Sequence, residues 1–364
     1  MLPYWIMLLF PALVAIASRP VMAMNADGTR RLKVSFAWIG VYVLLVLGVG
    51  FRFEVGGDWF NYFRYLAQGS LLDFADLGEV DDPGYMALNI LSADLGFGMT
   101  GVHVLGAMLF GFGLVVFLRS LPRPWLGLAC AVPYLVIVVG MGYTRQGIAL
   151  GLVMVGLVAL RRQKYLSFAI WVFLGALFHK SAVLIIPVAA LTADRLRLRG
   201  IGLLGLIGYI AYDGLLAEHT DRLVDVYIEQ QLTDSQGAFI RLAMNAVPAM
   251  LFMVLGKRFL MAPSEYRLWR AISLISIAMF VALLMTGFTT ALDRMALYFI
   301  PLQLVVFAHL PDALGRKNGK NTAIVSGIIG YYAAVLFVWL NFATHSQYWL
   351  PYKFGLSLSI IGEL

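Results

Sequence analysis

Four cations in this sequence stand where an apolar stretch resumes after a polar loop. They are Arg145, Lys180, Arg241 and Arg294, and His103 has a similar place. A helix N-terminus already carries about half a positive charge, so a cation added there is unfavourable unless an anion shares the site. Backbone N–H groups and guanidinium groups together make good phosphate sites. The pattern therefore predicts a shared anion site, although each side chain alone could instead reach lipid headgroups.

Carboxylates near the end of the second apolar stretch could supply a base. In RFEVGGDWFNYFRYL (residues 52–66), Asp58 follows two glycines and precedes apolar residues with helical spacing. Asp58 is therefore predicted to be the N-cap of an interfacial helix, and it could also accept a proton from a hydroxyl group. Glu54 is a rival for this second role. The acidic residues from Asp73 to Asp82 lack the spacing of an ordered metal loop and are expected to be solvated.

A histidine and a lysine interrupt another apolar stretch, in the sequence FHKSA at residues 178–182. His179 is the histidine most suited to chemistry, either as a proton carrier or as a donor to an anion. His219 and His345 stand alone in polar loops, and no role is predicted for them. The only cysteine is Cys130, which excludes a disulfide framework, and neither a metal site nor a cofactor is expected.

The composition determines the class of protein that must position these groups. Of the 364 residues, 61% are hydrophobic and only 13% are charged, against roughly 25% charged in a soluble domain. Long apolar stretches recur throughout, which predicts an all-α, polytopic integral membrane protein. The net charge of +7 does not indicate a nucleic-acid partner, because Lys and Arg lie in short runs between apolar stretches, as topology signals do.

About twelve helical segments are expected within a single transmembrane domain, residues 1–364. Several are short or broken relative to the roughly 20 residues that span a bilayer. The first resembles a signal peptide, but no positive charge precedes it, so it is taken as a membrane helix. The segments are 2–17, 34–51, 100–118, 125–142, 145–160, 165–178, 181–193, 201–217, 240–256, 271–289, 294–310 and 322–340.

Six basic runs test this arrangement, because cytoplasmic loops are enriched in Lys and Arg. If all six face the cytoplasm, each gap between them must hold an even number of crossings. Four of the five gaps do so directly. Residues 165–193 do so only as two short helices that meet at FHKSA. The runs are Arg30–Lys33, Arg119–Arg123, Arg161–Lys164, Arg195–Arg199, Lys257–Arg270 and Arg316–Lys320.

This topology places the unusual polar stretches on the outer, periplasmic side of the membrane. Residues 52–99 become the first periplasmic loop, with its interfacial helix at 59–67. Residues 218–239 form a second loop, and residues 341–364 a periplasmic C-terminal segment. Chemistry is therefore expected on the outer face, and the cytoplasmic loops are expected to be plain anchors.

Five stretches, in this order and spacing, resemble the EpsG/Wzy-like family of polysaccharide polymerases. The resemblance extends from about residue 35 to 355, and RQGIA followed by FHKSA about thirty residues later is its most specific part. Residues 195–237 and the first thirty residues do not share it. The stretches are RFEVGGDWFNYFRYL, TRQGIALGLVMVGLVAL, LFHKSAVLIIPV, LDRMALYFIP and LPYKF.

The resemblance implies a glycosyltransferase of GT-C-like helical architecture in the bacterial inner membrane. Such proteins polymerise repeat units carried on undecaprenyl pyrophosphate, without a metal or nucleotide sugar, so donor and acceptor are both lipid-linked glycans. Membrane lipids, a flippase and a chain-length regulator of the same pathway are the other implied partners. In GT-C enzymes the catalytic carboxylate lies in the first outer loop, which favours Asp58.

The family's recurrent positions, read together with the residue analysis, give three sets of expected site residues. The catalytic candidates are Asp58, His179 and Glu54. The expected pyrophosphate-binding residues are Arg52, Arg145, Lys180, Arg294 and Arg241. The expected substrate-binding residues are Tyr62, Gln146, Ser181, Asp293, Tyr298 and Tyr352, and Gly56 is a further recurrent position.

Three other functions fit parts of the sequence. An O-antigen ligase would use the same lipid-linked donor with a different acceptor. A transporter or lipid flippase could bind an anion at a broken helix, although the polar groups lie toward one face and no half-chain repeat is visible. A membrane O-acyltransferase using His179 is the weakest of the three.

The topology is testable by single-cysteine labelling in a Cys130→Ser background. A membrane-impermeant thiol reagent should label only the positions on the outer side, because the bilayer shields the others. Labelling of position 197 from outside would contradict the two-helix interpretation of residues 165–193. Cysteines at Tyr143, Lys180 and Gln230 should react from outside, and those at Lys164, Arg197 and Lys317 should not.

Overall fold

The computed structural model describes residues 1–21, 35–192, 237–286 and 289–355, and this part of the chain is almost entirely helical. Its only β-type pairing is an isolated bridge between Arg52 and Phe354. Five described helical segments are long and apolar enough to cross a membrane, and shorter apolar helices accompany them. The predicted all-α, polytopic membrane class is therefore confirmed.

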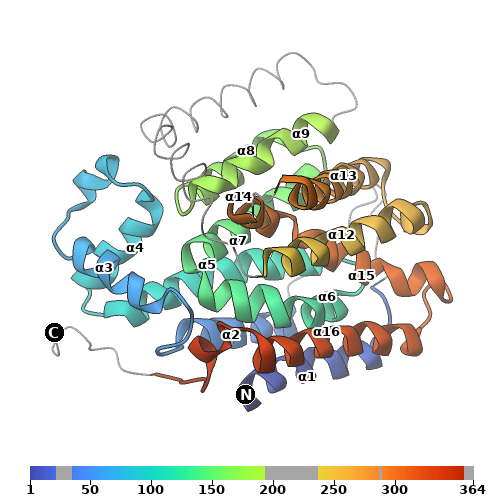
Figure 1. Ribbon diagram of the computed structural model, residues 1–364, viewed down its shortest axis with the longest axis horizontal. Coiled ribbons are helices and arrows are strands. Elements are labelled where there is room, and N and C mark those ends of the chain that lie inside the picture. Colours follow the sequence, from blue (N-terminus) through green and yellow to red (C-terminus); the bar gives the residue numbers. More distant parts are fainter. Residues whose placement is uncertain (22–34, 193–236, 287–288, 356–364) are drawn as a thin grey trace.

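Helices run through the chain in the order labelled in Figure 1. The segment predicted as the first periplasmic loop contains α3 (Trp59–Gly69), η1 (Phe74–Glu79) and α4 (Pro83–Asp94). The other elements are α1 (Leu2–Ala17), α2 (Phe36–Gly50), α5 (Gly98–Arg119), α6 (Pro124–Ala131), η2 (Val132–Gly140), α7 (Thr144–Leu160), α8 (Tyr165–Ala176), η3 (Lys180–Ile185), α9 (Ile186–Thr192), α12 (Ala238–Leu255), η6 (Gly256–Arg258), α13 (Pro263–Thr286), α14 (Thr289–Ala296), η7 (Leu297–Phe299), α15 (Pro301–Leu314), α16 (Thr322–Phe342) and η8 (Ser346–Trp349).

Eleven of the twelve expected segments have a helical counterpart, and the twelfth, 201–217, lies outside the described residues. The predicted break at FHKSA is confirmed, because α8 ends at Ala176 and η3 begins at Lys180. Three details differ. The segment 294–310 is split into α14, η7 and α15, α13 begins earlier than expected, and α4 adds a second helix to the outer loop. The basic runs at 30–33 and 195–199 and most of the 218–239 loop also lie outside the described residues.

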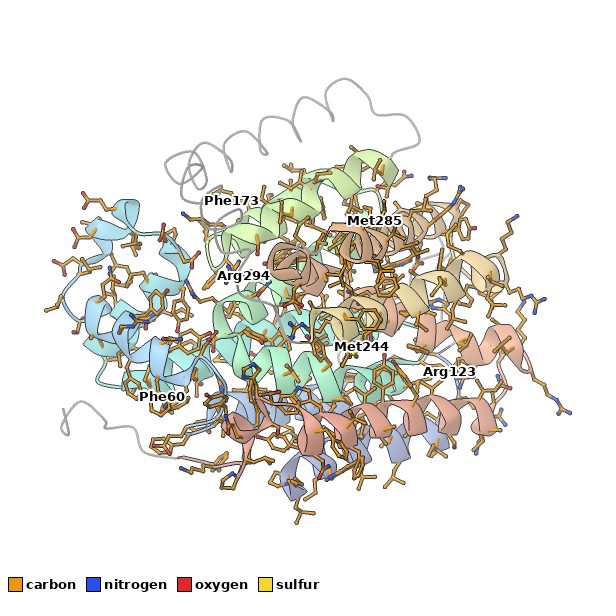
Figure 2. The ribbon with its side chains drawn as sticks, viewed as in Figure 1. Phe60, Arg123, Phe173, Met244, Met285 and Arg294 are labelled. Carbon is orange, nitrogen blue, oxygen red and sulfur yellow. The ribbon has the colours of Figure 1, made fainter. Side chains whose placement is uncertain are left out.

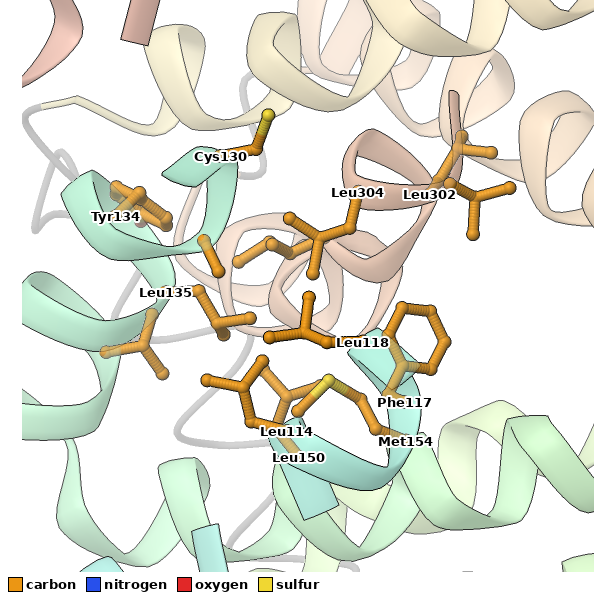
Figure 3. Close-up of a cluster of buried hydrophobic side chains, with 14 of the residues drawn as sticks. Leu114, Phe117, Leu118, Cys130, Tyr134, Leu135, Leu150, Met154, Leu302 and Leu304 are labelled. Carbon is orange, nitrogen blue, oxygen red and sulfur yellow. The ribbon is translucent and has the colours of Figure 1, made fainter. Parts of the chain in front are cut away.

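Helices α5 and α7 form the centre of the bundle, and small residues bring their backbones together. A Cβ atom on Gly113 would lie 1.9 Å from the carbonyl oxygen of Gly151, and one on Gly151 would lie 2.8 Å from Cα of Phe110. Such contacts are the usual means of close helix packing in a membrane. Figure 3 shows the apolar core around them, where Leu114 and Leu118 of α5 meet side chains from α7, η2 and α15.

The described basic runs gather at one end of the bundle, as the even-crossing rule requires. Arg123 forms an ion pair with Asp312 at 2.8 Å, and Arg161 forms one with Glu265 at 3.0 Å. Figure 2 places Arg123 toward this end, and Phe60 and Arg294 toward the other. The expectation of plain anchors is wrong for these two arginines, since both are buried and join separate helices.

At the opposite end, α3 and α4 form a lobe beside the bundle (Figure 1), which is called the outer lobe after the predicted topology. The segment after α16 is hydrogen-bonded to the residues that lead into this lobe. The backbone N–H of Phe53 donates to the carbonyl of Lys353 at 3.0 Å, and that of Gly56 donates to the carbonyl of Tyr348 at 2.9 Å. Gly56 has a φ of +116°, and a Cβ there would lie 2.4 Å from the carbonyl oxygen of Met141. Glycine is thus required at this position by the packing of the chain itself.

Candidate active site

A cavity of about 230 Å³ opens where the outer lobe meets the bundle. It contains three guanidinium groups, two carboxylates and one imidazole, supplied by segments that are far apart in the sequence. The lining residues are Asp58, Tyr62, Tyr134, Tyr143, Arg145, Gln146, His179, Arg241, Asp293, Arg294 and Leu297. Eight of these eleven are among the residues singled out from the sequence, so the structure brings most of the candidates together.

The start of α7 is fixed by a chain of hydrogen bonds from the outer loop. The backbone N–H of Thr144 donates to the hydroxyl of Tyr62 at 2.8 Å. The side-chain hydroxyl of Thr144 accepts from Nη2 of Arg52 at 2.8 Å. The Arg52 guanidinium also donates to the carbonyls of Val49 and Val55. Arg52 is only 2% exposed. Its hydrogen bonds therefore hold the start of α7, the helix that presents Arg145 to the cavity.

Arg145 forms one charged wall of the cavity, and a carboxylate from the outer lobe that does not itself line the cavity forms an ion pair with it. Its Nη1 lies 2.6 Å from Oδ2 of Asp82, and its guanidinium carbon lies 4.6 Å from the centre of the Tyr65 ring. Asp82 is 9% exposed. The expectation that the acidic stretch is solvated is therefore wrong at this residue, because the part-buried guanidinium of Arg145 holds the Asp82 carboxylate out of water.

A second ion pair fastens the same stretch to the broken helix. Nζ of Lys180 lies 2.9 Å from Oδ1 of Asp81, and the backbone N–H of Gly84 donates to the carbonyl of Leu177 at 2.8 Å. Lys180 is not among the residues that line the cavity. Its contacts hold α4 against the break between α8 and η3, which also presents His179.

The facing wall is built around Arg241 of α12. Its guanidinium forms a two-pronged ion pair with the carboxylate of Asp293. Gln146 donates from Nε2 to the carbonyl of Arg294 at 3.0 Å, and Asn245 donates to the carbonyl of Ala296 at 2.7 Å. These contacts join α7, α12 and α14 around the cavity.

Arg294 differs from the other two cavity arginines. Its side chain is exposed, and it reaches the cavity from α14, on the side that faces the outer lobe in Figure 2. Within the described ranges, no carboxylate forms an ion pair with it. Its charge is therefore the one most available to an incoming anion.

Asp58 occupies the N-cap position of α3, but its carboxylate makes no capping hydrogen bond. The capping part of the prediction is therefore wrong, and the carboxylate lines the cavity instead. Burial raises the pKa of Asp58 above its usual range, against the opposing effects of Arg145, a hydrogen bond with Asn61, and Arg294. Such a carboxylate is a stronger base than an ordinary aspartate once it is ionised.

Several expected site residues lie outside the cavity lining. Glu54 forms an ion pair with Lys353 near the surface. The hydroxyl of Tyr352 donates to the carbonyl of Gly48 at 2.8 Å, beneath the outer lobe. Ser181 and Tyr298 are buried behind His179, which Ser181 contacts directly.

The sequence matches the model of the EpsG family over residues 35–354. The chain belongs to the EpsG family. The matched range contains every residue that lines the cavity. Membership indicates a membrane protein of polysaccharide biosynthesis, of the polymerase or glycosyltransferase kind. No curated protein matches the chain, and no solved structure does either.

Three residues that line the cavity of this EpsG-family protein were not predicted from the sequence, namely Tyr134, Tyr143 and Leu297. Tyr143 directly precedes the TRQG stretch, so its position was a usable signal. Tyr134 gave none, because it lies in a π-helix, η2, whose wider turn changes which face each residue takes. The described residues contain no group of three or more His, Cys, Asp or Glu side chains that could hold a metal ion.

The Asp82–Arg145 ion pair should contribute measurably to stability. Asp82→Asn should lower the free energy of unfolding by on the order of 3 kcal/mol, because it leaves a largely buried guanidinium without its counter-charge. Asp81→Asn is the matched control, and its cost should be below about 1 kcal/mol, since the Asp81 side chain is 63% exposed. The measurement is unfolding of the two purified variants in detergent, and equal losses for both would contradict this interpretation.

Proposed function

We propose that this EpsG-family protein polymerises oligosaccharide repeat units carried on undecaprenyl pyrophosphate, at the outer face of the bacterial inner membrane. The observation that carries the proposal is the cavity itself. It combines one carboxylate free of any capping bond, Asp58, with three arginines, as a glycosyl transfer with a diphosphate leaving group requires.

In the proposed reaction, the donor is the growing glycan on its lipid diphosphate and the acceptor is a hydroxyl group of the next lipid-linked unit. The bond between the anomeric carbon and the diphosphate oxygen breaks, and a bond from that carbon to the acceptor oxygen forms. The acceptor proton passes to the carboxylate of Asp58. The lipid diphosphate leaves with the electron pair of the broken bond.

The arginines would stabilise the charge that develops on this leaving group. Arg294 would bind the diphosphate first, because no described carboxylate forms an ion pair with it. Arg145 and Arg241 would then share their guanidinium donors between phosphate oxygens and Asp82 or Asp293. Guanidinium groups that are already held in place need little rearrangement in the transition state, which is the main source of electrostatic catalysis.

Two other candidates for the base are less well placed than Asp58. Glu54 is outside the cavity and is engaged by Lys353. His179 lines the cavity, but it shares it with Arg145 and Arg294, so the further positive charge that protonation of its ring would add is disfavoured.

The size of the cavity limits which part of the substrate it can enclose. Its volume of about 230 Å³ is below the roughly 300–1,000 Å³ of pockets that surround a drug-sized ligand. Only the reacting ends of the two glycans would enter, and the remaining sugars would lie along the outer lobe. Tyr62, Tyr134 and Tyr143 line the cavity and could stack on sugar faces.

A ligase that moves the same donor onto another glycan acceptor is the nearest alternative, because its donor chemistry is identical. A transporter is less favoured, since the cavity lies at one end of the bundle, beside the outer lobe, and not at mid-depth. A flippase and a chain-length regulator of the same pathway are the proposed partners of the polymerase.

Asp58→Asn should abolish polymerisation and leave the fold intact, because Asn has nearly the same shape and no capping bond is lost. In the wild type, the rate should fall as pH drops through the raised pKa of Asp58, since the protonated carboxyl cannot accept a proton. The assay is gel analysis of products made from a defined lipid-linked repeat unit. Glu54→Gln is the control and should polymerise normally. A ladder of polymers from Asp58→Asn would remove Asp58 from catalysis, and transfer of single units to another acceptor would indicate a ligase.

Arg294→Gln should reduce the turnover rate by ~10²-fold or more, a typical loss when one charge-stabilising donor is removed. Its thermal stability should change little, because Arg294 is exposed and has no ion pair with the described residues. Arg316→Gln, an exposed arginine at the other end of the bundle, is the control. Equal turnover in the two variants would show that Arg294 does not act on the leaving group.

A further inference from the structure

The imidazole of His179 is hydrogen-bonded to a short relay of two buried hydroxyl groups, those of Ser181 and Tyr298. Its Nδ1 lies 2.6 Å from Oγ of Ser181, and that hydroxyl lies 3.1 Å from the hydroxyl of Tyr298. Ser181 and Tyr298 are 9% and 1% exposed. The ring of His179 lines the cavity, whereas neither Ser181 nor Tyr298 does. The two hydroxyl groups of the relay therefore lie on the side of the imidazole that is away from the cavity.

The direction of the hydrogen bonds in this relay follows from one backbone group. The N–H of Ser181 points at Nδ1 of His179, at 3.4 Å, and a backbone N–H can only donate. Nδ1 must then accept, so it carries no proton. Consequently the Ser181 hydroxyl donates to Nδ1, and it accepts from the hydroxyl of Tyr298. In a neutral ring the remaining proton is on Nε2.

We infer that Ser181 and Tyr298 are positioning residues that hold neutral His179 with its Nε2–H as a fixed hydrogen-bond donor toward the cavity. A donor so placed suits an anionic oxygen, and the ligand class it fits is a diphosphate flanked by Arg145 and Arg294. This assignment of the ligand rests on the proposed function, whereas the protonation pattern of the ring does not. His179 then stabilises the leaving group and is not the base.

Another histidine among the described residues, His309, has the opposite hydrogen-bond pattern at Nδ1. Nδ1 of His309 lies 2.8 Å from the carbonyl oxygen of Val305, which can only accept. A neutral His309 therefore carries its proton on Nδ1, which is the opposite pattern. The two rings provide an internal reference for any method that distinguishes the two nitrogens.

The first test is nitrogen NMR of the protein with ¹⁵N-labelled histidine, in lipid discs and without substrate. The chain has five histidines, and the His179→Gln and His309→Gln variants assign the two signals. His179 should show an unprotonated Nδ1 and a protonated Nε2, and His309 the reverse. Ser181→Ala should change the ratio of the two neutral forms of His179 by about fivefold toward the form with a protonated Nδ1, the effect expected for the loss of one net hydrogen bond. A protonated Nδ1 in wild-type His179 would overturn the inference, whatever the activity.

Tyr298→Phe removes only the far hydroxyl of the relay and should shift the His179 signals in the same direction as Ser181→Ala. Tyr332→Phe is the matched control, because Tyr332 is also 1% exposed and its hydroxyl donates to Gln303 in another part of the bundle. It should leave the His179 signals unchanged. Equal shifts in both variants would show that the relay does not set the protonation pattern.

The second test separates a donor from a base by turnover. His179→Gln keeps an N–H donor near the position of Nε2, so it should retain activity within about tenfold of the wild type. His179→Ala should lose ~10²-fold or more, as expected for a missing donor. Equal loss in both variants would make His179 a base and overturn the assignment. If the expected NMR pattern appears but the wild type makes no polymer, the proposed function fails and the protonation pattern stands.

Discussion

The end of the bundle beside α3 and α4 is organised by the need to neutralise cations that begin apolar helices. Arg145 and Arg241 each stand at the start of a helix and largely out of water, where an unpaired charge is costly. Each is matched by a carboxylate from a distant segment, Asp82 for the first and Asp293 for the second. These pairs determine where the outer lobe and α14 can lie, and the cavity is the space between them.

The same two ion pairs stabilise the fold and hold the guanidinium groups in place for the proposed chemistry. An ion pair at the cavity wall holds a guanidinium in place, and those of its five N–H donors that the carboxylate does not engage can bind a second anion. Arg294, which has no ion pair with the described residues, would recognise the substrate, and the two paired arginines would follow. A resting site that is already neutral on two sides is also less prone to bind stray anions.

The elements of the fold were largely predictable, and the partners within the site were not. Apolar length and the even-crossing rule located the helices and the break at FHKSA, because hydropathy records what each segment must bury. Asp82 could not be recognised, since an acidic run has the same composition whether it is solvated or bound to a guanidinium. Asp58 was placed at the right helix start, but its backbone conformation, with φ −93° and ψ 6°, makes no capping bond. Its freedom for chemistry depends on that local geometry.

Trp349 has a consequence for how the protein is made. Its ring packs against Gly142 and donates to the carbonyl of Ile137 at 2.8 Å, while its own carbonyl accepts from the hydroxyl of Tyr4, 345 residues away. The neighbouring Tyr348 carbonyl accepts from Gly56, just before Asp58. The segments on both sides of the cavity are thus braced by residues that leave the ribosome long after them. A nascent chain, even with its early helices inserted, would hold an unfinished cavity until residue 349 has been synthesised and packed beside Gly142.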